Sequence, residues 1–390
     1  MTPGVTLRRG VEVRERIGDV PRDAWNALVG DGSPFLDWDF LHALEDTGCA
    51  TARKGWRPLH LTTWTDGPLR RLVAAMPLYL KGHSHGEFVY DWAWAEAAQR
   101  LGRPYYPKLV AAVPFSPVAG ARLLVAPGED RAARMQALLA AADDLARELG
   151  ASGLHVLYPD LAEAEELERL GLALRPGLRH RFRNEGYATF ADFLGRFTAK
   201  KRAQIRRERL EVERAGITFD TRTGDDVRPE LVDAMHACYR ATVDKYPWGH
   251  PYLNRPFFAR IVDTFRRHLH LVVARKEGRV IGMSINVHKG GALYGRYWGG
   301  EDGHAFLHFS ACYYEPIDWC IQHGVGVFDP GAGGEHKAPR GFLVESQPSA
   351  HRLHDPVLAS LLGRAMERER AMLSSSLDEI RAQDSPFKRA

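Results

Sequence analysis

The sequence predicts an α+β protein in which one unit, a mixed and mostly antiparallel sheet flanked by helices, is present twice. Two observations lead to this expectation. In each half of the chain, closely spaced β-type runs are followed by an amphipathic helix and then by another short apolar run. The length of 390 residues also leaves room for two domains, each with a core of its own.

The first half begins with a predicted hairpin. Its β-type runs at 57–64 and 69–80 are joined by Thr65-Asp66-Gly67, where glycine readily adopts a positive φ. Apolar residues spaced by three and four over 129–149 predict an amphipathic helix that ends at Gly150. The half is completed by a strand, a helix and a further β-type run at 153–158, 160–169 and 172–182.

The second half repeats this order. Three β-type runs at 269–275, 279–288 and 292–298 are separated by glycine-containing turns, which predicts an antiparallel meander. A helix follows over 304–323, with a kink at Pro316 because proline lacks an amide hydrogen and its ring clashes with the preceding turn. Residues 325–329 have the composition of a buried strand.

Two further helices lie outside the repeated order. The segment 198–214 is highly charged, and both a solvated linker and a contact with tRNA or a membrane surface are open interpretations. Apolar residues at helical spacing over 357–380 predict a C-terminal amphipathic helix. The expected divisions are an N-terminal domain, a linker helix, a C-terminal domain with the active site, and a final helix with its tail: 1–190, 191–214, 215–356 and 357–390.

Composition excludes several classes of protein. There are 53 Lys and Arg residues against 49 Asp and Glu, so the net charge of +4 is too small for a surface that is coated with nucleic acid. Apolar runs fall short of 18 residues, and MTPGVTLRRG lacks a signal-peptide core, so neither a membrane span nor secretion is expected. The four cysteines form no CxxC pair, which predicts reduced thiols and a cytoplasmic location.

Seven strings carry a resemblance to a known family: SPFLDWDFLHALE (33–45), MPLYLKGHSHGEFVYDWAWAEA (76–97), YYPKLVAAVPFSPVAGARLL (105–124), KKRAQIRRER (200–209), ALYGRYWGG (292–300), LHFSACYYEPIDWCI (307–321) and FDPGAGGEHKAPRGF (328–342). Through them the chain resembles the bacterial peptidoglycan biosynthesis/recognition family of N-acyltransferases, distant relatives of the Fem-type aminoacyltransferases. The resemblance implies two tandem GNAT-like domains and acyl transfer from an activated donor to an amine. The long helical hairpin that many Fem enzymes insert is not evident, which favours acyl-coenzyme A over aminoacyl-tRNA as the donor.

The resemblance implies a place for the donor. In a GNAT arrangement, the donor pyrophosphate lies at the start of the helix that follows the central strand, because free N–H groups and the helix dipole favour anions there. Here that position is Gly299, Gly300 and Gly303. Acyl-coenzyme A is expected as a co-substrate, with no tightly bound cofactor. A plain loop is the alternative, since Glu301 and Asp302 would repel a pyrophosphate.

The strand that precedes these glycines supplies three candidate side chains. Alternation along a strand places Arg296 and Trp298 on one face and Tyr297 on the other. Arg296 and Trp298 are candidates for substrate binding, although Arg296 could instead pair with Glu315 or Glu335. Tyr297 is a candidate general acid or a core residue.

His308 is the first candidate base. The ordinary pKa of histidine suits deprotonation of an ammonium near neutral pH, and a satisfied or exposed histidine is the alternative. A metal is not expected, because His304 and His308 lack a third ligand in the pattern and HExxH is absent.

The loop GAGGEHKAPRGF at 331–342 supplies the remaining candidates. Glu335 beside His336 could orient a base or act as one, while Lys337 and Arg340 could bind a carboxylate or phosphate. An internally paired surface loop is the alternative.

The first half offers a weaker candidate. KGHSHGEFVYDWAW combines histidines and carboxylates with tryptophans, as in a cleft rim or in a half-buried strand and turn. For the whole chain, the leading hypothesis is an N-acyltransferase. The alternatives are a GNAT-fold module that recognises a cell-wall precursor or peptide without turnover, and a tRNA-dependent aminoacyltransferase. The oligomeric state is left open.

Overall fold

The computed structural model describes residues 10–245, 249–331, 333 and 336–388. The chain forms two compact units. Unit 1 comprises Met1–Gly177 and Ser346–Ser375, and unit 2 comprises Leu178–Glu345 and Ser376–Ala390. Both units combine helices with mixed, mostly antiparallel sheets, which confirms the predicted fold class.

The two units differ in extent from the predicted domains for a topological reason. Strand β17 (Ser349–Leu353) follows the second half in sequence but pairs with two strands of unit 1, β8 (Gly153–Val156) and β9 (Ala173–Arg175). Conversely, β10 (Leu178–Arg183) lies within the expected first domain but pairs with β15 (Val327–Asp329) in unit 2. Each unit is therefore built from two separate parts of the chain.

Unit 1 contains two sheets. The four-stranded sheet has the order β1-β3-β4-β7, and the six-stranded sheet has the order β2-β5-β6-β8-β17-β9. Besides β8, β9 and β17, the strands of these sheets are β1 (Val11–Arg14), β2 (Arg57–Pro58), β3 (His60–Trp64), β4 (Leu72–Met76), β5 (Leu78–Lys81), β6 (Lys108–Ala111) and β7 (Leu124–Val125).

The predicted hairpin of unit 1 is present as the antiparallel pair β3–β4. Each of its two β-type runs breaks, one at Leu59 and the other at Pro77, so that β2 and β5 pair with each other in the second sheet. A proline has no amide hydrogen to donate within a sheet, which is consistent with the break at Pro77.

Helices cover the sheets of unit 1. Asp130 and Asp160 cap α4 and α5 by accepting hydrogen bonds from backbone amides three residues ahead. The apolar face of α4 packs into the main core of this unit, together with side chains of both sheets. The helices are α1 (Arg22–Val29), α2 (Trp38–Asp46), α3 (Trp92–Arg100), α4 (Arg131–Glu148), α5 (Leu161–Arg169) and the first part of α12 (Pro356–Asp384).

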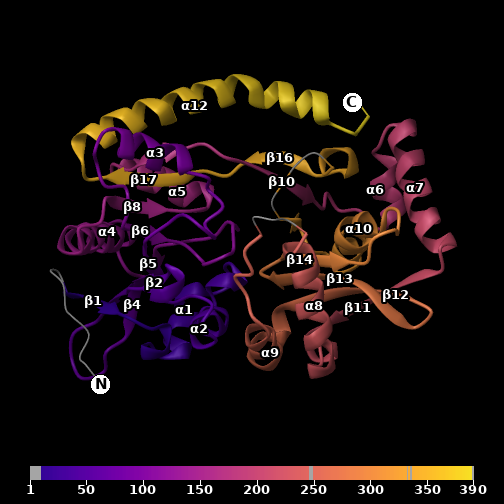
Figure 1. Ribbon diagram of the computed structural model, residues 1–390, viewed down its shortest axis with the longest axis horizontal. Coiled ribbons are helices and arrows are strands. Elements are labelled where there is room, and N and C mark those ends of the chain that lie inside the picture. Colours follow the sequence, from indigo (N-terminus) through magenta and orange to yellow (C-terminus); the bar gives the residue numbers. More distant parts are fainter. Residues whose placement is uncertain (1–9, 246–248, 332, 334–335, 389–390) are drawn as a thin grey trace. The chain divides into compact units, whose positions relative to one another are not determined.

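Unit 2 is organised around one seven-stranded sheet (Figure 1) with the order β11-β12-β13-β14-β15-β10-β16. The predicted meander is present as three antiparallel strands, β12 to β14. The additional strands are β11 (Ile217–Thr223), β12 (Leu269–Lys276), β13 (Arg279–Lys289), β14 (Ala292–Gly300) and β16 (Leu343–Ser346).

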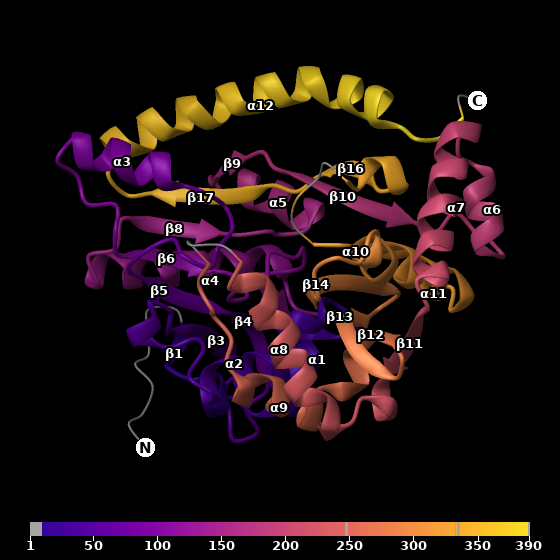
Figure 2. The same ribbon diagram turned by 45° about the vertical axis from the view of Figure 1, so that its right-hand side comes forward.

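Helices pack on both faces of this sheet. Helix α8 (Val232–Val243) lies across β13 and β14 (Figures 1 and 2) and is accompanied by α9 (Arg255–Thr264). The other face is covered by the helical segment 307–322, whose apolar side chains join the core with α6 (Phe190–Gly195) and α7 (Ala199–Arg214).

The segment 307–322 is one continuous run of three helical pieces, of which the first and last are α-helical and the middle one is π-helical. It begins as α10 (Leu307–Phe309), continues as the π-helical turn η8 (Ser310–Tyr314) and ends as α11 (Glu315–Gln322). The irregularity predicted at Pro316 thus takes the form of a wider turn immediately before the proline. This turn accommodates the missing N–H group of Pro316 and the bulk of its ring.

Two further expectations concern the redox state of the cysteines and the absence of a membrane span. Cys49, Cys238, Cys312 and Cys320 are all free thiols. Among the residues that the structure describes, no helix is long and apolar enough to cross a membrane.

Candidate functional site

The candidate site of unit 2 lies where two parallel strands part. β14 pairs with β15 over Ala292–Tyr294 and Val327–Asp329, after which β14 continues to Gly300 while β15 ends. At the point of separation the two backbones are in close contact, because a Cβ added to Gly295 would lie 3.2 Å from the backbone of Pro330. The second half of β14 therefore extends past β15 beside the loop that follows Asp329, and we refer to this point of separation as the opening between β14 and β15.

The second half of β14 directs its rings to opposite faces of the sheet. The Tyr297 ring packs against Tyr239 and Phe258 on the side of α8 and α9, with centroids 5.4 and 6.2 Å away. The Trp298 ring contacts His308 on the other side, at 5.5 Å. The predicted opposition of these two side chains is confirmed. Tyr297 itself is half-buried.

Arg296 departs from the predicted alternation because β14 has a bulge at this residue. Ile285 of β13 pairs with Tyr297, whereas the next residue, Asn286, pairs with Gly295. Arg296 is therefore the additional residue of the bulge, and its guanidinium lies 5.2 Å from the Tyr297 ring centroid. Glu315, one partner expected for Arg296, instead lies 3.5 Å from Arg209.

A buried carboxylate marks the end of β15. Asp329 is 1% exposed, and it accepts hydrogen bonds from Arg179 Nε at 2.6 Å and from the Gly331 amide at 3.0 Å. Arg181 Nε lies 3.5 Å from the same carboxylate. Sequence reasoning missed Arg179 and Arg181 because they stand about 150 residues before Asp329.

Lys337 approaches this carboxylate from the loop. Its side chain is buried, and Nζ donates a hydrogen bond to the Gly331 carbonyl oxygen at 2.6 Å. The pKa of Lys337 is lowered to about 8, mainly by burial and in part by nearby Arg179, while Asp329 opposes the change. At neutral pH most of the Lys337 ammonium is still protonated.

Arg340 is held by groups of the protein itself. Its guanidinium makes a bidentate contact with Glu208 of α7, through Nη2 at 2.8 Å and Nε at 3.2 Å, and donates to the Tyr314 hydroxyl at 2.9 Å. It also lies over the Phe309 ring, 3.4 Å from the centroid. Sequence reasoning missed Glu208, although its spacing from the buried residues Ile205 and Val212 matches the inner face of a helix.

The two candidate histidines differ in environment. Burial lowers the pKa of half-buried His308 to about 4, and the positive charges of Arg340 and Lys337 add to this effect. The near-neutral pKa expected from the sequence is therefore wrong for His308. His336 is exposed, with its ring 5.5 Å from that of Phe309. Glu335 lies outside the described residues.

The glycines expected near a donor pyrophosphate serve different purposes. A Cβ on Gly299 would lie 1.8 Å from the Cys238 carbonyl oxygen, so this glycine permits close packing of α8 on β14. A Cβ on Gly300 would meet the Trp298 ring at 2.7 Å. Gly303 has φ +89° and open space around it, as in a turn. Close packing thus explains Gly299 and Gly300, and turn geometry explains Gly303.

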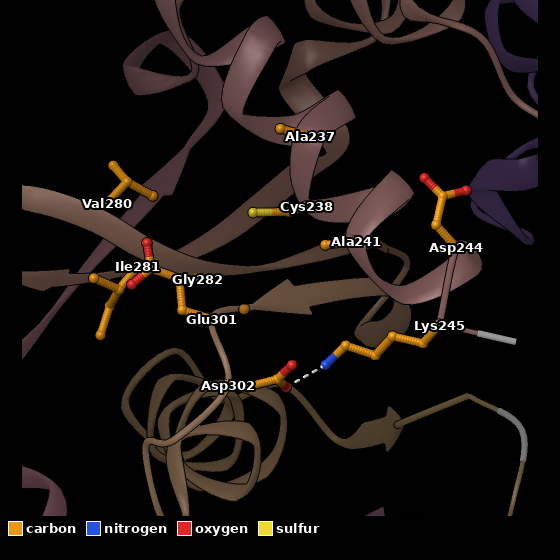
Figure 3. A pocket seen from close by; sticks show the side chains of 11 residues that line it. Ala237, Cys238, Ala241, Asp244, Lys245, Val280, Ile281, Gly282, Glu301 and Asp302 are labelled. Atoms are coloured by element: carbon orange, nitrogen blue, oxygen red, sulfur yellow. Dashed lines mark hydrogen bonds and ion pairs between the residues drawn. The ribbon is translucent and has the colours of Figure 1, made fainter.

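A pocket of about 500 Å³ adjoins Gly300 between α8 and the ends of β13 and β14 (Figure 3). Small side chains of α8 face it together with Val280, Ile281 and Gly282. At its rim, Lys245 Nζ lies 2.6 Å from Asp302. Glu301 and Asp244, which also line the pocket, are paired with arginines outside it. The pocket thus has an apolar floor and a rim of exposed ion pairs.

The first-half segment KGHSHGEFVYDWAW contributes carboxylates to a buried network within unit 1. Lys108 donates to Glu87 at 2.8 Å, and Tyr105 donates to Asp91 at 2.6 Å. Both carboxylates are at most 3% exposed, so they are interior groups. Two further histidines of unit 1 are also paired, His351 with His155 and His354 with Asp143.

Comparisons with known proteins extend these observations. A family model described as peptidoglycan biosynthesis/recognition, FemAB-like, matches residues 16–389. A search of curated proteins gave no match.

Several solved structures share the fold. FemX matches with 12% identity and a TM-score of 0.50 over 80% of this chain and 92% of that chain. L-PGS from Bacillus licheniformis matches with 13% identity and a TM-score of 0.50 over 83% and 95% of the two chains. A conserved protein of unknown function from Bacteroides thetaiotaomicron matches with 10% identity and a TM-score of 0.53 over 87% and 99%. At such identities the likeness establishes the fold alone.

Proposed function

The chain belongs to the FemAB-like family of peptidoglycan biosynthesis/recognition, a family of acyl- and aminoacyltransferases, and we propose that it transfers an acyl or aminoacyl group from an activated donor to an amine. The observation that supports this proposal most is the parting of β14 and β15, with Asp329, Lys337 and His308 gathered beside the opening.

The proposed reaction is an attack of the acceptor nitrogen on the donor carbonyl carbon. The bond from that carbon to the leaving sulfur or oxygen then breaks, and the proton from nitrogen passes to a base. His308 is uncharged above about pH 4 and can accept this proton, although its low pKa makes it a weak base. The Lys337 ammonium can donate to the oxyanion that develops on the carbonyl oxygen.

Other candidate residues have supporting roles in this proposal. Trp298 and Arg296 border the substrate on the β14 side. Exposed His336 is a second candidate proton acceptor at the edge of the site. Arg340 has its guanidinium engaged by Glu208 and Tyr314, so we assign it a role in holding the loop rather than in contacting the substrate.

Two donor classes fit the proposal. We propose acyl-coenzyme A first, with its slender pantetheine arm between the parted strands, as a co-substrate. Aminoacyl-tRNA is the alternative, because α7 exposes Lys200, Arg206 and Arg207 on its outer surface, where they could contact phosphates. A steep loss of binding with rising salt would identify the tRNA.

Recognition of a cell-wall precursor without turnover is a second candidate function. It is favoured by Glu301 and Asp302, which occupy the turn where a donor pyrophosphate is expected. The cations beside them, Arg279 and Lys245, are already paired with these carboxylates.

The test begins with ligand binding by the purified protein. Thermal unfolding is measured with coenzyme A, short- and long-chain acyl-coenzyme A, and total tRNA at two salt concentrations. A ligand at about 100 times its Kd should raise the melting temperature by a few degrees. The bound donor is then incubated with a panel of amines, and amide formation is followed by mass spectrometry. Absence of amide with every donor, together with tight binding of a precursor peptide, would replace the enzyme proposal by the recognition proposal.

A further inference from the structure

We infer that Glu208, on the charged helix α7, is a positioning residue for the acyl-transfer site: it fixes Arg340, which in turn holds the His336–Lys337 segment beside the opening between β14 and β15. The inference rests on the proposed function and adds to it a residue that lies 132 positions from Arg340 in the sequence.

The Glu208 carboxylate accepts hydrogen bonds from the side chains of Arg340, Tyr314 and Gln204. Its side chain is 2% exposed, and its two oxygens accept hydrogen bonds from Arg340 Nη2 at 2.8 and 2.9 Å. The Tyr314 hydroxyl, from the π-helical turn, donates to the same carboxylate. Gln204 Nε2 contributes a further hydrogen bond at 2.9 Å from one turn earlier in α7. A planar guanidinium bound side-on to a carboxylate allows little rotation.

Arg340 is in turn hydrogen-bonded to the loop at His336 and Lys337. Its Nη1 donates to the His336 carbonyl oxygen at 2.9 Å, and its backbone amide donates to the Lys337 carbonyl oxygen at 2.9 Å. Lys337, the proposed oxyanion donor, and His336, the second candidate proton acceptor, are thus both tied through their backbones to Arg340. The guanidinium also lies against the Phe309 ring, which contacts His308 and His336.

A buried ion pair can position side chains without stabilising the fold. Taking two charges out of water opposes folding, so replacement of a buried pair by apolar residues of similar volume is often neutral or stabilising. Helix α7 is in addition anchored by the buried side chains Ile205 and Val212, which do not depend on the ion pair. What an apolar pair cannot reproduce is the hydrogen bond from the Arg340 guanidinium to the His336 carbonyl oxygen.

The experiment compares three variants of the full chain. Glu208→Gln removes the charge, the double variant Glu208→Met with Arg340→Met replaces the pair by apolar side chains, and Glu211→Gln is the control on the exposed face of the same helix. Each is assayed for amide formation with the donor identified for the wild-type protein, and each is unfolded thermally.

The expected result is a fall in kcat of at least about tenfold for both Glu208 variants with a smaller change in KM, because misplacement of reacting groups acts on the chemical step. The double variant is expected to melt near the wild-type temperature and still to lack activity, while Glu211→Gln behaves like the wild type. Wild-type kcat in a folded double variant would overturn the inference.

A spectroscopic measurement keeps the inference testable if the double variant does not fold or if the proposed function fails. In protein labelled at histidine, NMR resonances of His308 and His336 are expected to move in Glu208→Gln and to stay in place in Glu211→Gln. Unchanged resonances in Glu208→Gln would overturn the inference. Absence of transfer by the wild-type protein would instead overturn the proposed function alone.

Discussion

Asp329 illustrates at the scale of single residues how a buried charge depends on its partner. Its carboxylate neutralises Arg179, which is 6% exposed and cannot recover its hydration if the carboxylate is lost. We therefore expect Asp329→Asn to lower the free energy of unfolding by about 3–5 kcal/mol. Urea denaturation measures this change, with Asp226→Asn at an exposed position as the control. A loss similar to that of the control would show that Arg179 finds another partner.

The sequence located some of these residues and not others for a physical reason. Lys337 and Arg340 stand within one loop rich in glycine and charge, and such composition is visible without a structure. Glu208 and Arg179 stand far away in the sequence. Their pairing with Arg340 and Asp329, respectively, depends on the topology of the fold. The pKa of His308 was also beyond sequence reasoning, because its value follows from burial and from neighbouring charges.

At the scale of elements, close packing of α8 on β14 explains Gly299. A methyl group here would overlap the Cys238 carbonyl of α8, a backbone atom that cannot rotate away. We expect Gly299→Ala to destabilise the protein by at least about 2 kcal/mol. Chemical denaturation checks this, with Gly195→Ala as the control because an added Cβ there meets nothing within 4 Å. Equal stability of the two variants would mean that α8 shifts without strain.

A histidine on β12 makes the sheet of unit 2 sensitive to acid. Burial, with His288 nearby, lowers the pKa of His270 to about 3, against about 6.5 in an unfolded chain. The unfolded state then binds the proton first, so stability is complete above pH 6.5 and falls as the pH decreases toward 3. Between pH 7.5 and 5, this one group should reduce the free energy of unfolding by about 2 kcal/mol.

Urea denaturation of the wild type and of His270→Gln at these two pH values tests the expectation. The variant should lose less stability than the wild type on acidification. An equal loss in both proteins would assign the acid sensitivity to other groups.

The elements with strong periodicity were predicted well. The helices expected at 129–149, 160–169 and 198–214 are present as α4, α5 and α7, and the meander is present as β12 to β14. Strands that join a distant sheet, β10 and β17, could not be assigned to a unit, since nothing local encodes the partner of a strand. For the same reason, the two β-type runs of the hairpin did not reveal that each contributes to two sheets.

At the scale of the whole molecule, unit 1 depends on a strand supplied from late in the chain. β17 pairs with both β8 and β9, so its removal would leave two strands with unpaired backbone groups. We expect a chain that ends at residue 345 to lose the cooperative unfolding of unit 1. Hydrogen exchange measures this directly, and amides of β8 and β9 should exchange much faster than in the full chain. Retained protection of these amides would show that the six-stranded sheet tolerates the loss.

The central claim, acyl transfer at the opening between β14 and β15, is tested most directly by amide formation in wild-type protein and in Lys337→Met, with Lys276→Met as the control. Mass spectrometry follows the product from the donor that binds. We predict product with the wild type and the control, and a rate at least about 100-fold lower in a folded Lys337→Met, because removal of a single oxyanion donor has effects of this size. No product from the wild type with any donor, or an equal rate in Lys337→Met, would contradict the claim.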